Sequence, residues 1–539
     1  MKSNKRKGWK RYCFSSRLGK WVLIATSLWF IPAALCQAAA PKEFSFNIKH
    51  FSIEGLSPLS HAFIDDYFKP LQNRTYTLKE LHDVCKALEK VIHQKGYLFY
   101  QVIVPQQTMA AGNVKLKVMA FKLAKVNVTG NKYFSKDNIF ASLPILKKSS
   151  SPNAVDLTEA IKVANKHPSK QVQITFKSSK SPDEIEADIA VTDHRPYQAT
   201  LTGNNYGTSS SGGYRLIGAL QYSNLFGLDH IVNASYSISP DHLETVKQYG
   251  GSYSLPIYQM KGWLSAYYSN SSVNTGTVAT NITVTGSGEM FGLHYQQYLP
   301  KWGKYEHSLD VGIDSHYFIN NVLVNTIQEG STVRSTPFSA LYKGDYPWLN
   351  TYTSYYLQWV ANTAMGSQNN QSDYWNASEG KGARFDAKQD WQLMRYGGNF
   401  SVNVKEWLLQ TNLTGQQSPN PLIAGEQLGI GGSYDVRGYS QRETAADSAQ
   451  IIKLEVTTPT WEKTSMFSFF DYGHGHQQSI TPGQVKDYSL SGAGIGTRYQ
   501  WRDYFMGNVT YANALDTAPE AGGTKAGANR IYAMIVFKY

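Results

Sequence analysis

Few residue patterns in this 539-residue sequence are typical of a catalytic site or a metal site. His474 and His476 are two positions apart, so an extended segment would place both imidazoles on one face, where they could bind a metal ion. The flanking glycines instead favour a solvated turn at a strand end. Gly492–Gly496 lacks the spacing of a dinucleotide-binding loop, and the sequence has no Gly-x-Ser-x-Gly elbow or Walker loop. We therefore expect a protein that is not an enzyme and that uses no metal and no cofactor.

The composition indicates what such a chain could be instead. The chain contains 36 Tyr, 12 Trp and 44 Gly, whereas charged residues make up only 17% of it. Aromatic girdles, many turns and a low charge content are typical of a transmembrane β-barrel.

The first 40 residues have the order of a secretory signal. Eight basic side chains and no acidic one lie there, together with the apolar run Trp21–Leu35 and the small residues that follow it. We predict a signal peptide over residues 1–39. Its removal would leave +4 of the formal +12 charge, which is too little to favour nucleic-acid binding. It would also leave Cys85 as the one remaining cysteine, at helical spacing from neighbouring leucines and therefore in a core.

Two copies of one α+β pattern follow. The first small domain, residues 44–122, reads strand, helix, helix, strand, strand, and its first strand ends at Gly55. The second small domain, residues 123–195, repeats this order, with Gly130 in the place of Gly55. A repeat of this length predicts tandem domains, each a three-stranded sheet covered by two helices.

From residue 197 to residue 539, alternation replaces helical spacing. In residues 452–456, for example, Ile, Leu and Val alternate with Lys and Glu. One apolar and one polar face suit a strand between lipid and a watery lumen. A soluble propeller or sandwich is the alternative, but the last strand is apolar on one face and ends at Phe537 and Tyr539, which argues against it. The sequence predicts an all-β transmembrane barrel of 16 antiparallel strands.

The small domains resemble POTRA domains, and the order POTRA–POTRA–barrel resembles the two-partner secretion transporters, which export haemolysins and filamentous haemagglutinins. Asn165–Val172 and Asn224–Asp229 look like the family's sequences in the second POTRA domain and the first barrel hairpin. Two motifs are more specific. Val436-Arg437-Gly438-Tyr439 is similar to the tip of the family's inward-folded loop, and Phe469-Phe470-Asp471-Tyr472-Gly473 is similar to its F-x-D-x-G strand motif.

The resemblance implies an inward-folded loop, here around residues 425–446, whose Arg437 pairs with Asp471 on the barrel wall. A guanidinium can donate two charge-assisted bonds to one carboxylate, so this contact would fix an otherwise mobile loop. The motif residues that would support it are Val436, Gly438, Tyr439, Phe469 and Gly473. Strand parity predicts that Gly492, Gly494 and Gly496 also face inward, leaving a smooth groove for the loop or a passing chain.

The implied function is export across the bacterial outer membrane. The small domains would lie in the periplasm, bind an unfolded secreted protein (an adhesin, a haemolysin or a haem-binding protein) and pass it to the barrel. Such a partner could add a strand to an exposed sheet edge. The docking candidates in the first small domain are Phe99, Gln101, Ile103, Leu81 and Leu88.

The last strand resembles the signal that the barrel-assembly machinery reads, with Phe537 and Tyr539 as its aromatic residues. That machinery, periplasmic chaperones and outer-membrane lipid are therefore further expected partners. Two other functions remain open: an outer-membrane insertase of the same superfamily, and a passive pore or receptor. The family's plug helix has no room here, because Phe46 already starts the first predicted strand.

Overall fold

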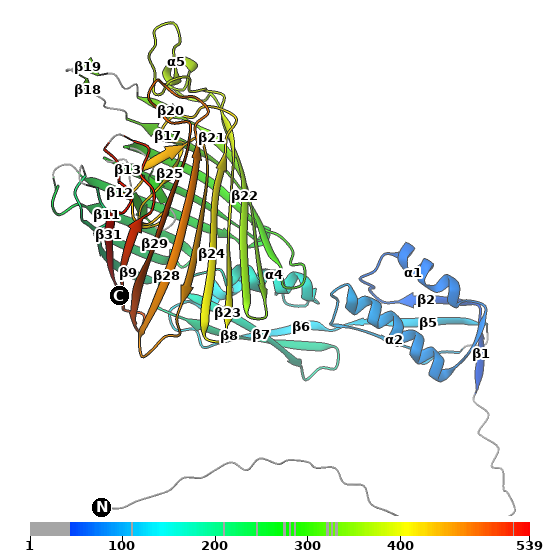
Figure 1. Cartoon of the computed structure of the whole chain (residues 1–539). Helices are drawn as coiled ribbons and strands as arrows, with labels where there is room; N and C mark the ends of the chain where they lie inside the picture. Colours follow the sequence, from blue (N-terminus) through cyan, green and yellow to red (C-terminus); the bar gives the residue numbers. More distant parts are fainter. Residues whose placement is uncertain are drawn as a thin grey trace, which may run out of the picture.

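The computed structural model describes residues 44–108, 111–208, 211–243, 246–272, 276–279, 282–284, 287–319, 323–324, 327–328, 332–520 and 522–539. The predicted signal peptide, residues 1–39, lies outside them. Two small α+β domains precede a closed barrel, and both lie at one end of it (Figure 1). Among the described residues, no helix is long and apolar enough to cross a membrane.

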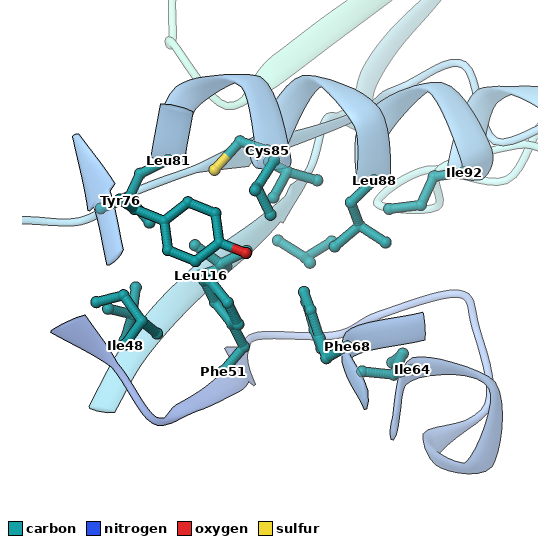
Figure 2. Close-up of a cluster of buried hydrophobic side chains, with 14 of the residues drawn as sticks. Ile48, Phe51, Ile64, Phe68, Tyr76, Leu81, Cys85, Leu88, Ile92 and Leu116 are labelled. Carbon is teal, nitrogen blue, oxygen red and sulfur yellow. The ribbon is translucent and has the colours of Figure 1, made fainter. Parts of the chain in front are cut away.

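The first small domain has one mixed sheet, in the order β2-β5-β4, with β2 and β5 parallel. Helix α2 lays its apolar side on this sheet, and the side chains between them are fully buried (Figure 2). The elements are β1 (Ser45–Ile48), β2 (His50–Glu54), α1 (His61–Phe68), β3 (Arg74–Thr77), α2 (Leu78–Gln94), β4 (Tyr100–Ile103) and β5 (Asn113–Ala120).

The second small domain repeats this topology, in the order β6-β8-β7 with β6 and β8 parallel. Its elements are β6 (Lys122–Thr129), α3 (Lys136–Ser142), α4 (Ala154–Ala164), β7 (Lys170–Ser178) and β8 (Glu184–Asp193). Gly55 and Gly130 occupy equivalent places, with φ of 102° and 84°. A side chain on either would overlap the carbonyl oxygen of Val118 or Val191, so both copies need glycine where the chain leaves the first strand. The predicted tandem α+β fold is confirmed.

The described residues from Tyr197 onward form a closed barrel of 16 antiparallel strands, as predicted, with β20 and β21 as two parts of one strand beside β17. Apolar side chains of alternating residues point outward, among them Ile452, Leu454 and Val456. The strands are β9 (Tyr197–Asn204), β10 (Arg215–Leu225), β11 (His230–Ile238), β12 (Lys247–Ile257), β13 (Gly262–Ser271), β16 (Gly288–Tyr298), β17 (Glu306–Phe318), β20 (Val333–Ser335), β21 (Pro337–Trp348), β22 (Thr351–Asn362), β23 (Gln392–Val404), β24 (Trp407–Gln417), β27 (Ser448–Thr457), β28 (Thr464–His476), β29 (Asp487–Trp501), β30 (Phe505–Ala514) and β31 (Asn529–Lys538).

The last strand closes the barrel against the first. Tyr539 exchanges main-chain hydrogen bonds with Ala199, at N–O distances of 2.9 and 3.0 Å. Phe537 points outward and packs on Phe505, with ring centroids 5.0 Å apart. The C-terminal aromatic residues therefore lie on the outer face, at the seam.

The thiol of Cys85 should report unfolding of the first small domain. Burial raises its pKa to about 11, and the thiolate is the reactive form. At pH 8 we expect maleimide labelling of Cys85 in the folded protein to be roughly a hundredfold slower than in urea. Peptide mass spectrometry would measure both rates, with Gln101→Cys as an exposed control. Equal rates in the folded and unfolded protein would contradict a buried thiol.

Candidate functional site

The connection between β24 and β27, residues 418–447, folds back against the inner wall of the barrel and is called the inward loop below. It contains a short hairpin of β25 (Leu428–Ile430) and β26 (Thr444–Ala446). Its buried apolar residues form one cluster with inner-wall residues of β27, β29 and β30. This cluster contains Ile430, Val436, Tyr439, Ala446, Ala449, Ile451, Tyr488, Leu490 and Ala514. The loop is thus packed against the wall rather than only tethered to it.

Arg437, at the tip of the inward loop, binds Asp471 of β28 in a two-point contact. Nε donates to Oδ2 at 2.6 Å and Nη2 donates to Oδ1 at 2.8 Å. The main-chain N–H of Arg437 also donates to Oδ2, at 3.1 Å. Arg437 is 6% exposed and Asp471 is fully buried, so little water competes for these bonds.

Further wall residues complete the environment of the guanidinium. Its carbon lies 3.4 Å from the ring centroid of Phe469, and Nη1 donates to Glu455 Oε2 at 3.1 Å. Glu455 also accepts from Arg498 at 2.6 Å, and that second guanidinium lies over Phe467. Two cations and two carboxylates therefore share one wall region. The sequence placed Glu455 on the lumen face by alternation, but gave no signal that it would join this contact.

The residues next to Arg437 are tied to β31, the last strand of the barrel. Tyr532 of β31 accepts a hydrogen bond from Gly438 N at 3.0 Å and donates to the carbonyl oxygen of Tyr439 at 2.6 Å. Gly438 has φ of 108°, a conformation that favours glycine. The hydroxyl of Tyr439 lies 2.9 Å from the carbonyl oxygen of Ser491. Sequence reasoning missed Tyr532, because its partners lie more than 90 residues away.

The predicted glycine groove is only partly present. A side chain at Gly492 would overlap the carbonyl oxygen of Arg437, so this glycine admits the loop tip. Gly494 and Gly496 face the same way, but the rings of Phe469 and Phe467 cover them. The expectation of a smooth groove along all three glycines is therefore wrong, because the neighbouring strand fills the space. Gly473 also makes room for the inward loop, since a side chain there would overlap Ile430 and Val436.

Two of the docking candidates are wrong. Leu81 and Leu88 are fully buried in the core of the first small domain, because helical spacing of apolar residues marks the face that meets the sheet (Figure 2). Phe99 packs on Phe176 of the second small domain, with ring centroids 4.5 Å apart and the ring planes tilted. Gln101 is exposed and Ile103 is half-buried, both on the edge strand β4.

Side chains from α2 and from the end of α4 cover outward main-chain groups of β4 and β7, one edge strand of each small domain. In the first small domain, His93 Nε2 lies 2.8 Å from the Tyr100 carbonyl oxygen, and Glu89 accepts from Val102 N at 3.0 Å. In the second, the Asn165 amide binds both main-chain groups of Val172, at 2.7 and 3.0 Å. A strand that adds to either edge must displace these side chains.

A buried polar cluster joins the second small domain to the barrel. Lys170 of β7 pairs with Asp229, in the turn between β10 and β11, at 2.5 Å. Asn138 bonds both partners, at 2.7 and 2.8 Å, and Tyr258 donates to Asp229. Burial lowers the pKa of the Lys170 ammonium, and the Asp229 carboxylate opposes that shift. Removing one partner of such a buried pair costs ~3–5 kcal/mol, so this joint holds the domain in a fixed orientation.

The two histidines considered as metal ligands end strand β28. His476 pairs with Asp487 at 2.6 Å, and His474 is within 3.1 Å of the Ser489 hydroxyl. Among the described residues, no group of three or more His, Cys, Asp or Glu side chains could hold a metal ion.

A 16-stranded barrel with two α+β domains at one end and a folded loop inside defines a class, the outer-membrane transporters with POTRA domains. The chain belongs to the family of haemolysin secretion/activation proteins ShlB/FhaC/HecB, which matches residues 184–499. The ShlB-type POTRA domain matches residues 46–120. The barrel accordingly lies in the outer membrane, and the small domains lie in the periplasm.

Curated relatives are distant but span most of the chain. The outer membrane transporter CdiB of Dickeya dadantii (strain 3937) is 21% identical over 440 residues, covering 79% of this chain and 75% of the relative. The heme/hemopexin transporter protein HuxB of Haemophilus influenzae (strain 86-028NP) is 20% identical over 490 residues, covering 82% and 78%. The solved structure of CdiB from Escherichia coli has the same fold, with a TM-score of 0.72 at 18% identity over 94% of this chain and 93% of that one.

The close approach of Gly492 to the loop tip makes a first test of the site. We expect Gly492→Ala to displace the tip at a cost of about 1–3 kcal/mol. The ion conductance of the purified barrel in planar lipid bilayers should then show an open fraction raised roughly tenfold. Gly218→Ala on β10, where an added methyl group meets nothing within 4 Å, is the control. Equal conductance of the two variants would show that the tip does not hold the pore closed.

Proposed function

We propose that this protein carries a large secreted partner protein, in an unfolded state, from the periplasm through the barrel to the cell exterior. The observation that carries this proposal is the inward loop, which is packed on the inner wall and fixed there by a two-point charged contact. Its relatives are named transporters, one of them for heme/hemopexin. The partner class proposed here is an adhesin, a haemolysin or a haem-binding protein.

The Arg437–Asp471 contact acts in this proposal as a reversible lock. A hydrogen bond to a charged group contributes about 1.5–3 kcal/mol, so two of them hold the tip firmly yet remain breakable at room temperature. Glu455 keeps the guanidinium paired on its other side. When the tip leaves the wall, space opens beside β28 and β29 for an extended chain. Folding of the partner outside the cell then biases the direction of transport, because no nucleotide is available in the periplasm.

Capture is proposed to occur on the small domains, residues 44–122 and 123–195. Strand addition at β4 would use the main chain of Tyr100 and Val102, with Gln101 and Ile103 beside the added strand. Glu89 and His93 must first release that edge, so a weakly pairing segment would be rejected.

Assembly of the barrel is proposed to need the general machinery of the outer membrane. Phe537 and Tyr539 lie on the outer face at the seam, where the barrel-assembly machinery could recognise them. Periplasmic chaperones would keep the unfolded barrel soluble before this step.

Export should depend on Arg437. In cells carrying Arg437→Ala, we expect the amount of the large secreted partner in the culture medium to fall at least about tenfold. Without its two charge-assisted bonds, the loop tip no longer returns to one fixed arrangement from which transport can start again. Arg437→Lys should give an intermediate loss, since an ammonium cannot form the two-point contact. Quantitative proteomics of the medium, compared with a deletion strain, identifies and measures the partner.

Lys463→Ala, which removes a cation from an exposed turn between β27 and β28, is the control for this experiment. Barrel folding is checked by heat-modifiable migration on gels. Undiminished export by a folded Arg437→Ala barrel would favour a passive pore. A general defect in outer-membrane protein assembly would favour an insertase.

The edge of β4 gives a separate test of capture. Glu89→Ala should free the Val102 N–H and increase crosslinking between the first small domain and the unfolded partner. The crosslinker is a photoreactive amino acid placed at Gln101. Lys86→Ala, an exposed change on the same helix, should leave the yield unchanged. A yield that Glu89→Ala does not alter would exclude β4 as the docking edge.

A further inference from the structure

The connection between β22 and β23, residues 363–391, is a folded unit at the end of the barrel away from the POTRA domains (Figure 1). We call it the outer cap. It contains the short helix α5 (Gln371–Tyr374), and Tyr374, Ala387 and Trp391 are fully buried within it. These residues form one apolar cluster with Leu422 and Ile423 of the inward loop. The cap therefore packs on the root of the loop whose tip carries Arg437.

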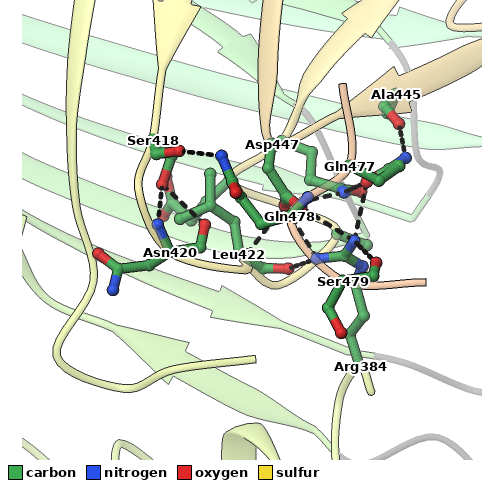
Figure 3. A network of polar contacts seen from close by, with 12 residues as sticks. Arg384, Ser418, Asn420, Leu422, Ala445, Asp447, Gln477, Gln478 and Ser479 are labelled. Atoms are coloured by element: carbon green, nitrogen blue, oxygen red, sulfur yellow. Dashed lines mark hydrogen bonds and ion pairs between the residues drawn. The ribbon is translucent and has the colours of Figure 1, made fainter. Parts of the chain in front are cut away.

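Arg384 of the outer cap is held by several parts of the barrel at once (Figure 3). Nη1 and Nη2 donate to the two carboxylate oxygens of Asp447, at 2.9 and 3.1 Å. The same guanidinium donates to the carbonyl oxygen of Leu422 at 2.6 Å and to the side-chain oxygen of Gln477 at 2.8 Å. It also reaches the carbonyl oxygen of Ser479 at 3.2 Å. One side chain thus joins the cap, the inward loop and the turn after β28.

Asp447 is the last residue of the inward loop before β27, and it is fully buried. Besides Arg384 it accepts hydrogen bonds from Leu422 N at 2.9 Å, Gln427 Nε2 at 3.1 Å and Gln478 N at 2.8 Å. A buried carboxylate with this many donors is stable only while its cation stays in place. Asp447 therefore couples the position of the root of the loop to that of the cap.

A second buried carboxylate anchors the inward loop near its start, in the part that follows β24. Glu426, also buried, accepts from Ser335 at 2.6 Å, contacts His316 at 2.8 Å and pairs with Arg395 at 3.3 Å. The loop is consequently fixed at its tip by Arg437 and at its root by Glu426 and Asp447. Loss of the Arg437–Asp471 contact therefore leaves the root attached to the wall and to the cap.

The contacts of the outer cap reach widely separated parts of the rim. Its apolar cluster extends to Met290 on β16 and Phe318 on β17. Arg384 reaches Gln477 and Ser479, beyond the end of β28. Between β16 and β28, along the wall, lie β17, β21, β22, β23, β24 and β27. A unit attached on both sides of so wide an arc can close the outer mouth of the lumen.

We propose that the outer cap is a latch across this mouth, fastened by the Arg384–Asp447 pair, and that it moves together with the root of the inward loop when a chain leaves. That it opens during transport rests on the proposed function. That the cap closes the resting pore does not depend on the proposed function, because ions flow through an open barrel without any partner protein. Arg384 acts here as a positioning residue.

The ion conductance of the purified full chain in planar lipid bilayers tests the latch. We expect Arg384→Ala to raise the fraction of time in open states tenfold or more, which corresponds to about 1.4 kcal/mol. Lys388→Ala is the matched control, because this cation lies in the same cap and pairs with Asp386 of the cap itself. The proposal would be overturned if the folded Arg384→Ala variant had the same conductance as the Lys388→Ala variant.

Arg384→Ala leaves a buried carboxylate without its cation and could fail to fold. The double variant Arg384→Ala/Asp447→Asn removes that charge and should show the same raised conductance. If the double variant folds and stays closed, the latch is excluded.

A crosslink separates the latch from the proposed function. In Arg384→Cys/Ser479→Cys, the two thiols are bridged by a short, cleavable bifunctional reagent. We expect the bridged protein to show low conductance and no export. Cleavage of the reagent should raise the conductance and allow export again. Low conductance with continued export would mean that the cap closes the barrel but does not lie on the route of a partner. Unchanged conductance in the fully bridged protein would overturn the latch itself.

Discussion

A barrel wide enough for a polypeptide cannot fill its lumen with the side chains of its own wall. Whatever fills it must be held firmly at rest and must leave without unfolding the wall. This chain meets both needs with a loop from one connection, held by apolar packing along its length and by buried ion pairs at its tip and root. Ion pairs suit this role because they are directional and fix one arrangement of the loop, whereas apolar contacts alone would allow several.

Buried ion pairs also fix parts of the molecule outside the lumen. Lys170 and Asp229 join the second POTRA domain to the barrel through a buried pair that neighbouring polar groups satisfy. The second POTRA domain thus meets the barrel in one orientation, and its apolar core extends onto the barrel through Tyr258 and Trp263. Apolar burial stabilises each domain and also the contacts between parts, and the buried ion pairs add a directional restraint to those contacts.

Much of this architecture is predictable from the sequence because it rests on local patterns. Alternation over residues 452–456 placed Glu455 on the lumen face, and the repeated glycine at 55 and 130 revealed the tandem domains. Arg437 and Asp471 were found through resemblance to a family motif. The pairs Lys170–Asp229 and Arg384–Asp447 join residues about 60 positions apart without any local signal, so only the folded chain reveals them. Leu81 and Leu88 were misassigned as docking residues although their spacing marked them as core.

The covered edges of β4 and β7 also matter for how many copies of this protein can share one membrane. An open strand edge is a template that pairs with any other exposed edge, including that of an identical neighbour. Glu89, His93 and Asn165 already occupy main-chain groups of these edges. Crowded copies thus resist pairing through β4 and β7, so that their periplasmic domains do not line up into one continuous sheet.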